Sequence, residues 1–254
     1  MSTIAEALQE FKSVSLKELD QVALQDRMDT KYVFTRTQLL EFLKTLKLHY
    51  NILEIEGNRM FNYESLYFDT HQFALYNMHY CGRLNRYKVR LRKYVESNLS
   101  FFEIKFKNNK GRTVKSRVRY NEGLQITGDA LHLLNEKSPL AESGLEPKIW
   151  INYVRITLAS KDFKERLTLD LNLTFKNNQE EVTHENLVIA EVKQSRAGQS
   201  AFNRLMKEHH IRRGSISKYC FGIASMFRDL RANNFKEQIK KITQTTYATA
   251  AGFK

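Results

Sequence analysis

Apolar and polar residues alternate along most of the chain between residue 60 and about residue 193. Period-two alternation with many β-branched and aromatic residues is typical of strands that bury one face. The pattern predicts strands in SLYFDT, NRYKVRLRKY, SFFEIKFK, RTVKSRVRY, KIWINYVRITL, ERLTLDLNLTF and NLVIAEVKQS. The NNKG sequence at residues 108–111 predicts a hairpin turn between two of these strands. The middle of the chain is therefore expected to form an antiparallel sheet.

Helical periodicity appears on both sides of this strand-rich region. Residues 15–24 repeat leucines at helical spacing, and a strand-like run, DRMDTKYVFT, follows them. Residues 35–46 place leucines on one stripe, with Thr35 and Gln38 at the spacing of a capping box. Residues 127–140 predict one helix among the strands, and residues 200–240 return to helix. We therefore predict an α+β fold with helices at its N- and C-terminal ends.

The segment NRYKVRLRKY places cations on one face of a predicted strand, because successive side chains of a strand point to opposite faces. This face carries Arg86, Lys88, Arg90 and Arg92. The opposite face carries Tyr87, Val89 and Leu91. The next predicted strands repeat the pattern, with one face carrying Lys105 and Lys107 and then Lys115, Arg117 and Arg119.

A sheet with one solvated face explains charges on any single strand. A solvated face usually mixes both signs, because like charges directly opposite one another destabilise a sheet. Here Arg and Lys dominate, and the few acids are Glu103, Asp170 and Glu191. A curved or closed sheet would aim the cations at a common interior, where guanidinium groups suit phosphate oxygens. The pattern favours a concave basic wall that binds a compact polyanion.

The overall charge also indicates an anionic partner. The 254 residues carry a net charge of +13, which fits nucleic acid, a membrane surface or a phosphorylated small molecule. A sheet that reads nucleic acid normally presents aromatic side chains for base stacking. On the basic faces Tyr153 is the clearest aromatic residue. We therefore expect phosphates and no nucleic acid as the ligand.

The composition predicts one cytoplasmic domain that covers residues 1–254. The chain has two prolines and ten glycines, and no stretch of it reads as an interdomain linker. No segment approaches the roughly 20 apolar residues that a membrane span requires. The two cysteines, Cys81 and Cys220, match no metal or redox spacing, which favours a reducing compartment.

An ordered series of motifs resembles the VTC domain, the polyphosphate polymerase branch of the triphosphate tunnel metalloenzymes. Over residues 25–225 the series reads DTKY, SLYFDT, RYKVRLRKY, FFEIKFK, VKSRV, YVRI, RLTLDLNL, VIAEVK and SISKY. The resemblance implies an antiparallel β-tunnel, a closed barrel-like sheet with a basic lumen, braced by the N- and C-terminal helices. It also implies transfer of the terminal phosphate of ATP to a growing polyphosphate chain, with Mn²⁺ or Mg²⁺ as the metal.

Positions that match the family's motifs imply a set of site residues. The implied catalytic cations are Lys31, Arg90, Arg92, Arg155 and Arg166. Further phosphate-binding residues are Arg86, Lys105, Lys115, Tyr153, Ser217 and Lys218, with Arg83 as an alternative to Arg86. Glu191 is the implied metal ligand, and Glu103 or Asp170 could assist it. The wider superfamily often begins with an ExExK pattern, but Arg27 stands at the first acidic position, so metal binding depends heavily on Glu191.

Three functions stay open at this stage. The resemblance favours the polymerase, for which positioned cations and a metal suffice without a side-chain nucleophile. A triphosphatase or tripolyphosphatase could use the same cations, because water can replace the phosphate acceptor. A non-catalytic sensor of polyphosphate or inositol phosphates would need only the binding. ATP and polyphosphate are the expected ligands. Since eukaryotic relatives attach this domain to membrane helices, a separate membrane protein is an expected partner.

Overall fold

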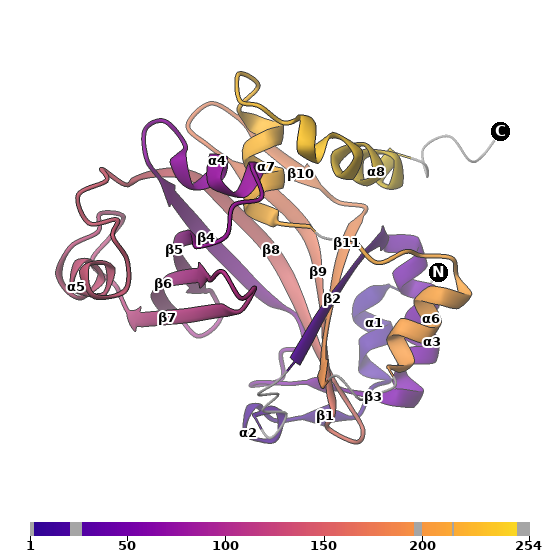
Figure 1. The fold of residues 1–254 in the computed structure, drawn as a ribbon. Coiled ribbons are helices and arrows are strands. Elements are labelled where there is room, and N and C mark those ends of the chain that lie inside the picture. Colours follow the sequence, from indigo (N-terminus) through magenta and orange to yellow (C-terminus); the bar gives the residue numbers. More distant parts are fainter. Residues whose placement is uncertain (1–2, 21–26, 196–199, 215, 248–254) are drawn as a thin grey trace.

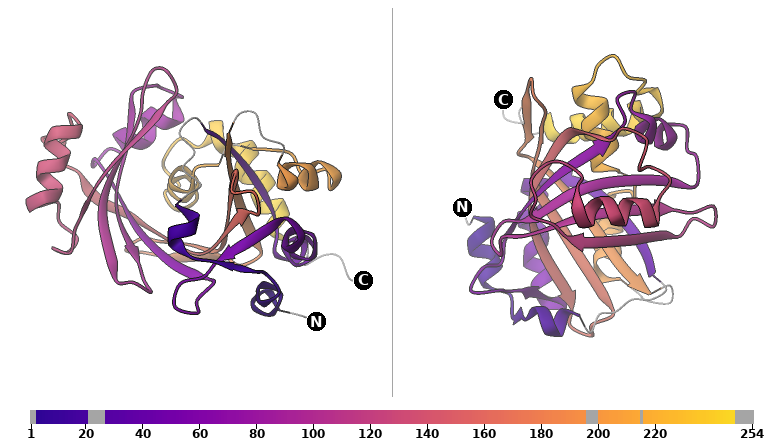
Figure 2. Two further views of the ribbon diagram at one scale, coloured as in Figure 1. Left: turned by 90° about the horizontal axis from the view of Figure 1, so that it is seen from below. Right: turned by 90° about the vertical axis from the view of Figure 1, so that its left-hand side faces the viewer.

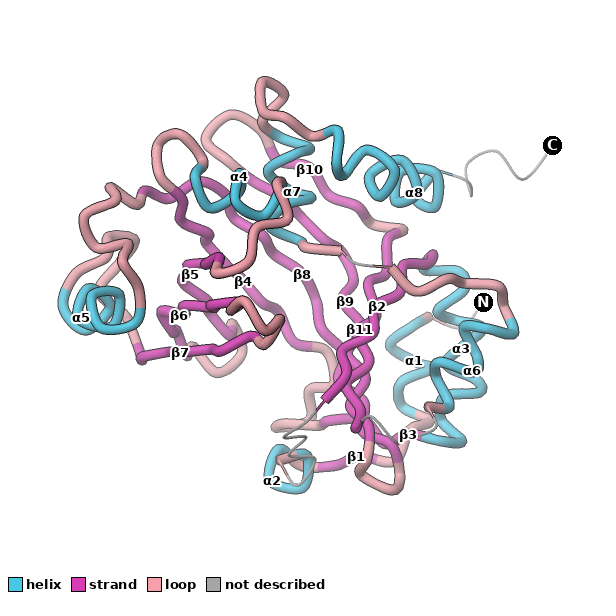
Figure 3. The backbone as a smooth tube through the Cα atoms, in the orientation of Figure 1, coloured by secondary structure: helices cyan, strands magenta, loops and turns pink. Residues whose placement is uncertain are grey.

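The computed structural model describes residues 3–20, 27–195, 200–214 and 216–247 of the chain (Figure 1). Its strands are β1 (Ser13–Val14), β2 (Arg27–Thr35), β3 (Tyr50–Leu53), β4 (Phe61–Asp69), β5 (Arg86–Tyr94), β6 (Leu99–Lys107), β7 (Thr113–Arg119), β8 (Glu146–Ser160), β9 (Glu165–Lys176), β10 (Glu181–His184) and β11 (Leu187–Ser195). Its helices are α1 (Ile4–Gln9), α2 (Leu16–Leu19), α3 (Arg36–His49), α4 (Ala74–Tyr80), α5 (Gly128–Lys137), α6 (Ala201–Glu208), α7 (Lys218–Met226), the 3-10 helix η1 (Asn233–Phe235) and α8 (Lys236–Tyr247). The large sheet and its flanking helices confirm the predicted α+β class (Figure 3).

Local sequence signals set several element boundaries. Thr35 caps α3 in a capping box, with the Gln38 amide donating to the Thr35 hydroxyl over 3.1 Å, as predicted. The predicted NNKG turn joins β6 to β7, and the Asn108 amide donates to the Arg112 carbonyl over 2.9 Å. The helix expected over 15–24 is described only as α2, and its residues 21–24 lie outside the described ranges. None of the described helices is long and apolar enough to cross a lipid bilayer.

The sheet is an open, curved trough. Its main path runs β2-β11-β9-β8-β4-β5-β6-β7, with all neighbours antiparallel, and Figure 2 shows the strands curving around a concave side. The two ends of this path, β2 and β7, do not pair with each other among the described residues. The prediction of a closed barrel-like tunnel is therefore wrong for this structure.

The chemistry of the two edge strands explains why the sheet stays open. β7 presents Lys115, Arg117 and Arg119 at alternate positions, and cations on an edge strand oppose further pairing. Another segment of the chain already pairs with part of the edge of β2, because the Gly214 amide donates to the Lys31 carbonyl over 2.9 Å. The chain that leads into α7 therefore lies beside β2 where a closing strand would have to pair.

Helices cover the convex side of the trough on both walls (Figure 2). On one wall α1, α3 and α6 bury an apolar cluster with β2, β8, β9 and β11, in which Phe42 and Phe202 are almost fully buried. On the other wall α5 packs Ala130 and Leu134 against Val89 of β5. Tyr87 and Leu91 pack against the same cluster. This confirms the predicted apolar face of the NRYKVRLRKY strand.

The concave side is divided between an apolar part and a charged part. We call it the inner face, defined as the face of the sheet that carries Arg90, Arg155 and Glu191. Helix α7 fills the apolar part, where Ile223 packs with Ile149, Ile151 and Phe175 of the sheet. The rest of the inner face carries the charged side chains. Helix α7 therefore ends the open trough at one side of the charged region.

Candidate functional site

Directly paired residues share a face of the sheet, so the strand register shows which predicted site residues lie together. Arg90 pairs with Tyr67 on one side and with Glu103 on the other. Further along the sheet, Arg155 pairs with Asp170, and Glu191 pairs with Lys31. The strands of the main path thus form one surface, to which β4 contributes Tyr67 and the other strands contribute charged side chains. The predicted cations of β2, β5, β6, β7, β8 and β9 converge on the inner face.

Arg90 and Arg92 are buried at the centre of this surface, with exposed fractions of 6% and 7%. The Arg90 guanidinium donates to the Tyr67 hydroxyl over 2.8 Å and to the Glu103 carboxylate over 2.7 Å. The Arg92 guanidinium donates to the Tyr153 hydroxyl over 2.9 Å. These hydrogen bonds hold both planar groups in fixed orientations, which is how arginine recognises phosphate with little loss of entropy.

Asp170 holds two further cations in place. The Arg155 guanidinium donates to its two carboxylate oxygens over 2.7 and 2.8 Å, and the Lys218 ammonium at the start of α7 also donates to it. Burial alone would raise the pKa of Asp170, but Arg155 and Lys218 hold it well below its ordinary value. Asp170 is therefore ionised and fully used as an ion-pair partner.

Glu103 has the same role on the opposite wall. Its side chain is completely buried and forms ion pairs with Arg90 and Lys115. Burial opposes ionisation, but Arg90 and the other nearby cations lower the pKa of Glu103 to about 2. Neighbouring Lys105 has its pKa lowered well below the ordinary value, chiefly by repulsion from Arg90 and then by burial. Extra negative charge would relieve this repulsion.

Glu191 differs from the other two carboxylates because its contacts are loose. Its oxygens lie 3.7 Å from the Lys31 ammonium and 3.7 Å from the Lys193 ammonium, beyond hydrogen-bond distance. Burial would raise the pKa of Glu191, but Lys31 and Lys193 lower it to about 2. Its side chain is 20% exposed. Glu191 is thus an ionised oxygen ligand that can still accept a cation.

The residues present fit a metal that is shared with the substrate. The described parts of the chain hold no group of three or more His, Cys, Asp or Glu side chains that could bind a metal by themselves. Mg²⁺ and similar ions often bind one or two carboxylates together with water and substrate phosphates. Of the three predicted carboxylates, Glu103 and Asp170 are held in close ion pairs, which leaves Glu191 for such an ion.

The start of α7 brings Ser217 and Lys218 to the inner face. Ser217 caps the helix by accepting from the Cys220 amide over 3.2 Å, and it also accepts from the Lys88 ammonium over 2.8 Å. Lys88 was not among the residues implied by the motifs, although it shares the cationic face of its strand. Arg86 instead donates to the Arg83 carbonyl over 2.6 Å, and Arg83 is exposed outside the strand.

Tyr63 is a second residue that the motifs did not indicate. Its ring stacks on Tyr153 with centroids 5.2 Å apart. The Arg155 guanidinium lies 4.9 Å and the Arg92 guanidinium 5.3 Å from the centroid of the Tyr63 ring. Cation–π contacts of this kind help to orient arginines. Only the register between β4 and β8 places Tyr63 here, and one sequence does not reveal that register.

Arg166 lies at the outer end of the charged region and also has a structural contact. Its guanidinium donates to the Leu19 carbonyl at the end of α2 over 2.7 Å. On the next strand Lys193 pairs with it in register. Part of the Arg166 side chain therefore ties the N-terminal segment to the sheet.

A family model for the VTC domain matches residues 26–227. The chain belongs to the VTC domain family. Comparison with curated protein sequences gave no match. The charged inner face described above lies within the matched part of this VTC domain.

Similar solved structures share little sequence with this VTC domain. A putative adenylyl cyclase from Hippeastrum, described as having a dominant triphosphatase activity, is 12% identical, with a TM-score of 0.49, and the match covers 78% of this chain and 96% of that one. A putative adenylate cyclase from Vibrio parahaemolyticus is 14% identical, with a TM-score of 0.43, and the match covers 76% of this chain and 96% of that one. A protein from Pyrococcus horikoshii is 9% identical, with a TM-score of 0.46, and the match covers 79% of this chain and 98% of that one.

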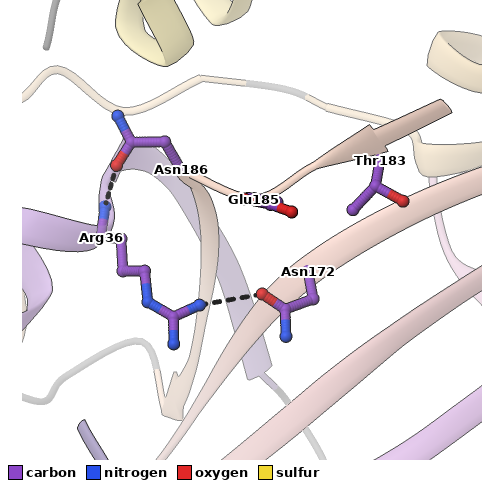
Figure 4. Close-up of a pocket in the computed structure, with 5 residues that line it drawn as sticks. All are labelled: Arg36, Asn172, Thr183, Glu185 and Asn186. Atoms are coloured by element: carbon purple, nitrogen blue, oxygen red, sulfur yellow. Dashed lines mark hydrogen bonds between the residues drawn. The ribbon is translucent and has the colours of Figure 1, made fainter. Parts of the chain in front are cut away.

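A separate cavity of about 630 Å³ shares no residue with the charged inner face. Figure 4 shows its lining residues, Arg36, Asn172, Thr183, Glu185 and Asn186. The Arg36 guanidinium donates to the Asn172 side chain over 2.9 Å, and the Arg36 amide donates to the Asn186 side chain over 3.1 Å. One arginine and one glutamate give this cavity no excess of positive charge. The inner face of the VTC domain is therefore the candidate site for a polyanion.

Proposed function

We propose that this VTC domain is a metal-dependent transferase that moves the terminal phosphate of ATP onto a growing polyphosphate chain. The observation that supports the proposal most is the inner face, where Arg and Lys from seven strands and α7 outnumber the described carboxylates, Asp29, Glu103, Asp170 and Glu191. Family membership adds support, since the resemblance implies the same activity. The ligands are ATP and polyphosphate.

Phosphoryl transfer depends mostly on positioning and on electrostatic stabilisation. Arg90, Arg92 and Arg155 are oriented before the substrate arrives, because carboxylates and tyrosine hydroxyls already hold them. Their remaining N–H groups bind phosphate oxygens, and Lys31, Lys105 and Lys115 add positive charge around the chain. Donors that are fixed in advance need no reorganisation when charge develops on the transferring group.

Glu191 would hold the divalent metal, Mn²⁺ or Mg²⁺, together with phosphate oxygens. Bound there, the metal supplies charge neutralisation for the transferring phosphoryl group. Lys31 and Lys193 on either side of Glu191 keep the carboxylate ionised. Ser217 and Lys218 bind phosphate from the α7 side of the trough. The attacking group is the terminal phosphate of the chain, so no side-chain nucleophile is required.

Purified protein incubated with ATP and Mn²⁺ tests this function. We expect consumption of ATP and a polymer that stains as polyphosphate on a gel. Release of orthophosphate from tripolyphosphate without polymer would instead establish a triphosphatase. Tight binding of tripolyphosphate without turnover of any phosphate substrate would establish a sensor.

An arginine variant ties the activity to the inner face. Arg92→Leu should weaken tripolyphosphate binding and ATP turnover together, because it removes a phosphate contact from both the ground state and the transition state. Arg204→Leu, an exposed arginine of α6 on the convex side, is the matched control and should behave as the parent. Equal activity of Arg92→Leu and the parent would place the site elsewhere.

A further inference from the structure

Asp69, the last residue of β4, is a completely buried carboxylate that is not among the predicted site residues. It accepts hydrogen bonds from the Leu75 amide over 2.8 Å and from the Tyr76 amide over 2.8 Å, both in the first turn of α4. It also accepts a hydrogen bond from the Tyr219 hydroxyl. Asp69 therefore joins the sheet, the start of α4 and the start of α7 in one set of contacts.

Tyr219 directly follows Lys218 in the first turn of α7 and is 2% exposed. Its ring stacks on Tyr67 with centroids 5.0 Å apart. The Tyr67 hydroxyl in turn accepts from the Arg90 guanidinium over 2.8 Å. Tyr219 thus contacts Asp69 through its hydroxyl and the centre of the inner face through its ring.

We propose that Asp69 and Tyr219 are positioning residues that fix the first turn of α7, so that Ser217 and Lys218 reach the phosphate-binding face. This inference rests on the proposed function. Tyr219 lies within the same helical turn as Lys218, so a shift of the Tyr219 ring moves the Lys218 backbone with it. The hydroxyl bond to Asp69 sets how deeply this turn enters the trough.

The short reach of Ser217 makes this position critical. The Ser217 hydroxyl accepts from the Lys88 ammonium over 2.8 Å, and its short side chain keeps this contact only while α7 stays in place. The long side chain of Lys218 could follow a displaced helix more easily. A displacement of about 1 Å can reduce the rate of a positioned reaction by about 100-fold. The Tyr67 stack allows the ring to slide in its plane, and the Asp69 bond opposes that sliding. The bond to Asp69 is therefore the contact that a point variant can remove while the ring stays buried.

The Tyr219→Phe variant tests the proposal, since it removes the hydroxyl and leaves the ring. We expect tripolyphosphate affinity, measured by calorimetry, to fall by about tenfold, and Asp69→Asn to weaken binding in the same direction. Tyr50→Phe is the matched control. Tyr50 is also a buried tyrosine whose hydroxyl donates to a buried carboxylate, Glu165, but it packs on the convex side of the sheet. Tyr50→Phe should keep the parental affinity.

A double variant separates positioning from a general loss of stability. In a background that carries Ser217→Ala and Lys218→Met, where both positioned groups are already gone, Tyr219→Phe should weaken binding much less than it does in the parent. Hydrogen exchange gives a readout that needs no ligand. The Cys220 amide donates to the Ser217 hydroxyl and the Phe221 amide donates to the Ser217 carbonyl. Both amides should exchange faster in Tyr219→Phe than in Tyr50→Phe.

The outcomes distinguish the two proposals. Parental affinity in Tyr219→Phe, or an equal loss with and without Ser217 and Lys218, would overturn the positioning role and leave the proposed function standing. A parent that binds no tripolyphosphate would overturn the proposed function, and with it the phosphate-positioning role. Reduced affinity in Tyr219→Phe with faster exchange at Cys220 and Phe221 supports the inference.

Discussion

Among the carboxylates on the inner face, Asp170, Glu103 and Glu191 have surroundings that give them different uses. Asp170 and Glu103 are buried between cations that contact them closely, so they act as fixed counterions that orient arginines and lysines. Glu191 is equally ionised, but its lysine neighbours are 3.7 Å away. The pKa of each of these three carboxylates is lowered, so the direction of the pKa shift does not distinguish their roles. The distances to their partners separate a structural counterion from a candidate metal ligand.

Glu191→Gln tests that assignment because the variant keeps the shape of the side chain and removes its charge. The protein should fold and should bind tripolyphosphate at least as tightly as the parent, since a negative charge has left the site. Turnover of ATP with Mn²⁺ should fall by about 100-fold or more, because charge on the transferring group is no longer neutralised. Calorimetry and a turnover assay measure the two effects. Glu181→Gln on β10, which is half-exposed, is the control. Parental turnover in Glu191→Gln would show that the metal binds elsewhere.

The lowered pKa of Glu103 predicts how acid affects the stability of the protein. Its pKa is lowered from 4.5 to about 2, so its contribution to stability is fully present above pH 4.5 and is lost as the pH falls toward 2. A shift of this size corresponds to roughly 3 kcal/mol. Glu103→Gln should therefore be less stable than the parent at pH 7, and the difference should narrow between pH 4.5 and pH 2. Denaturant unfolding at several pH values measures this. A difference that does not depend on pH would contradict the assignment, and Glu181→Gln should follow the parent throughout.

Among the helices, α7 is the one that connects the apolar core to the site. Gly222 in its middle lies so close to the sheet that an added Cβ would meet Ile149 Cδ1 at 2.8 Å and Phe175 Cδ1 at 2.8 Å. Both neighbours belong to the buried cluster under α7 and have little room to move. The absence of a side chain at Gly222 therefore allows the middle of α7 to lie this close to the sheet.

Gly222→Ala should push α7 outward and affect stability and binding together. We expect a loss of about 1–3 kcal/mol in the free energy of unfolding, which is typical of overpacking in a filled core. Tripolyphosphate affinity should also fall, since Ser217 and Lys218 move with the helix. Gly214→Ala is the matched control, because nothing lies within 4 Å of an added Cβ there. Denaturant unfolding and calorimetry measure the two effects. An unchanged tripolyphosphate affinity in a destabilised Gly222→Ala protein would show that binding does not depend on the position of α7.

The sequence predicts the elements better than their assembly, for a physical reason. Alternation within one strand is local, so it placed Arg90 and Arg92 on one face and Val89 on the other correctly. The Lys88 contact with Ser217 depends on where α7 packs, and the two residues are 129 positions apart. Tyr63 likewise enters the site only through the register of β4 against β8. Such pairings are set by tertiary packing, and period-two patterning does not encode them.

The overall shape of the sheet departs from expectation at the open edge between β2 and β7. The cations of a strand face indicate a concave wall, but they do not show whether the wall closes on itself. Lys115, Arg117 and Arg119 lie on the edge strand β7, which ends the sheet. Under the proposed function, an open trough would let a long phosphate chain enter from the side as well as from an end. The basic surface is therefore continuous with solvent along β7.

This openness predicts a strong effect of salt on binding. Charges that remain accessible to solvent are screened over a Debye length of about 10 Å at 0.1 M salt, whereas deeply buried pairs are screened less. Several lysines of the site are partly exposed, including Lys31 at 34% and Lys115 at 35% of their side-chain surface. Many such cations act on one polyanion, so tripolyphosphate affinity should fall at least about tenfold between about 0.05 M and about 0.5 M KCl.

Calorimetry at several salt concentrations measures this slope. Lys115→Met should reduce the dependence of tripolyphosphate affinity on salt, because one screened contact is gone. Lys47→Met on α3 of the convex side should leave this dependence unchanged. An affinity for tripolyphosphate that does not change with salt would contradict an open cationic trough. It would instead require a binding mode in which a few buried hydrogen bonds hold the ligand, and the cations along β7 would then have no part in recognition.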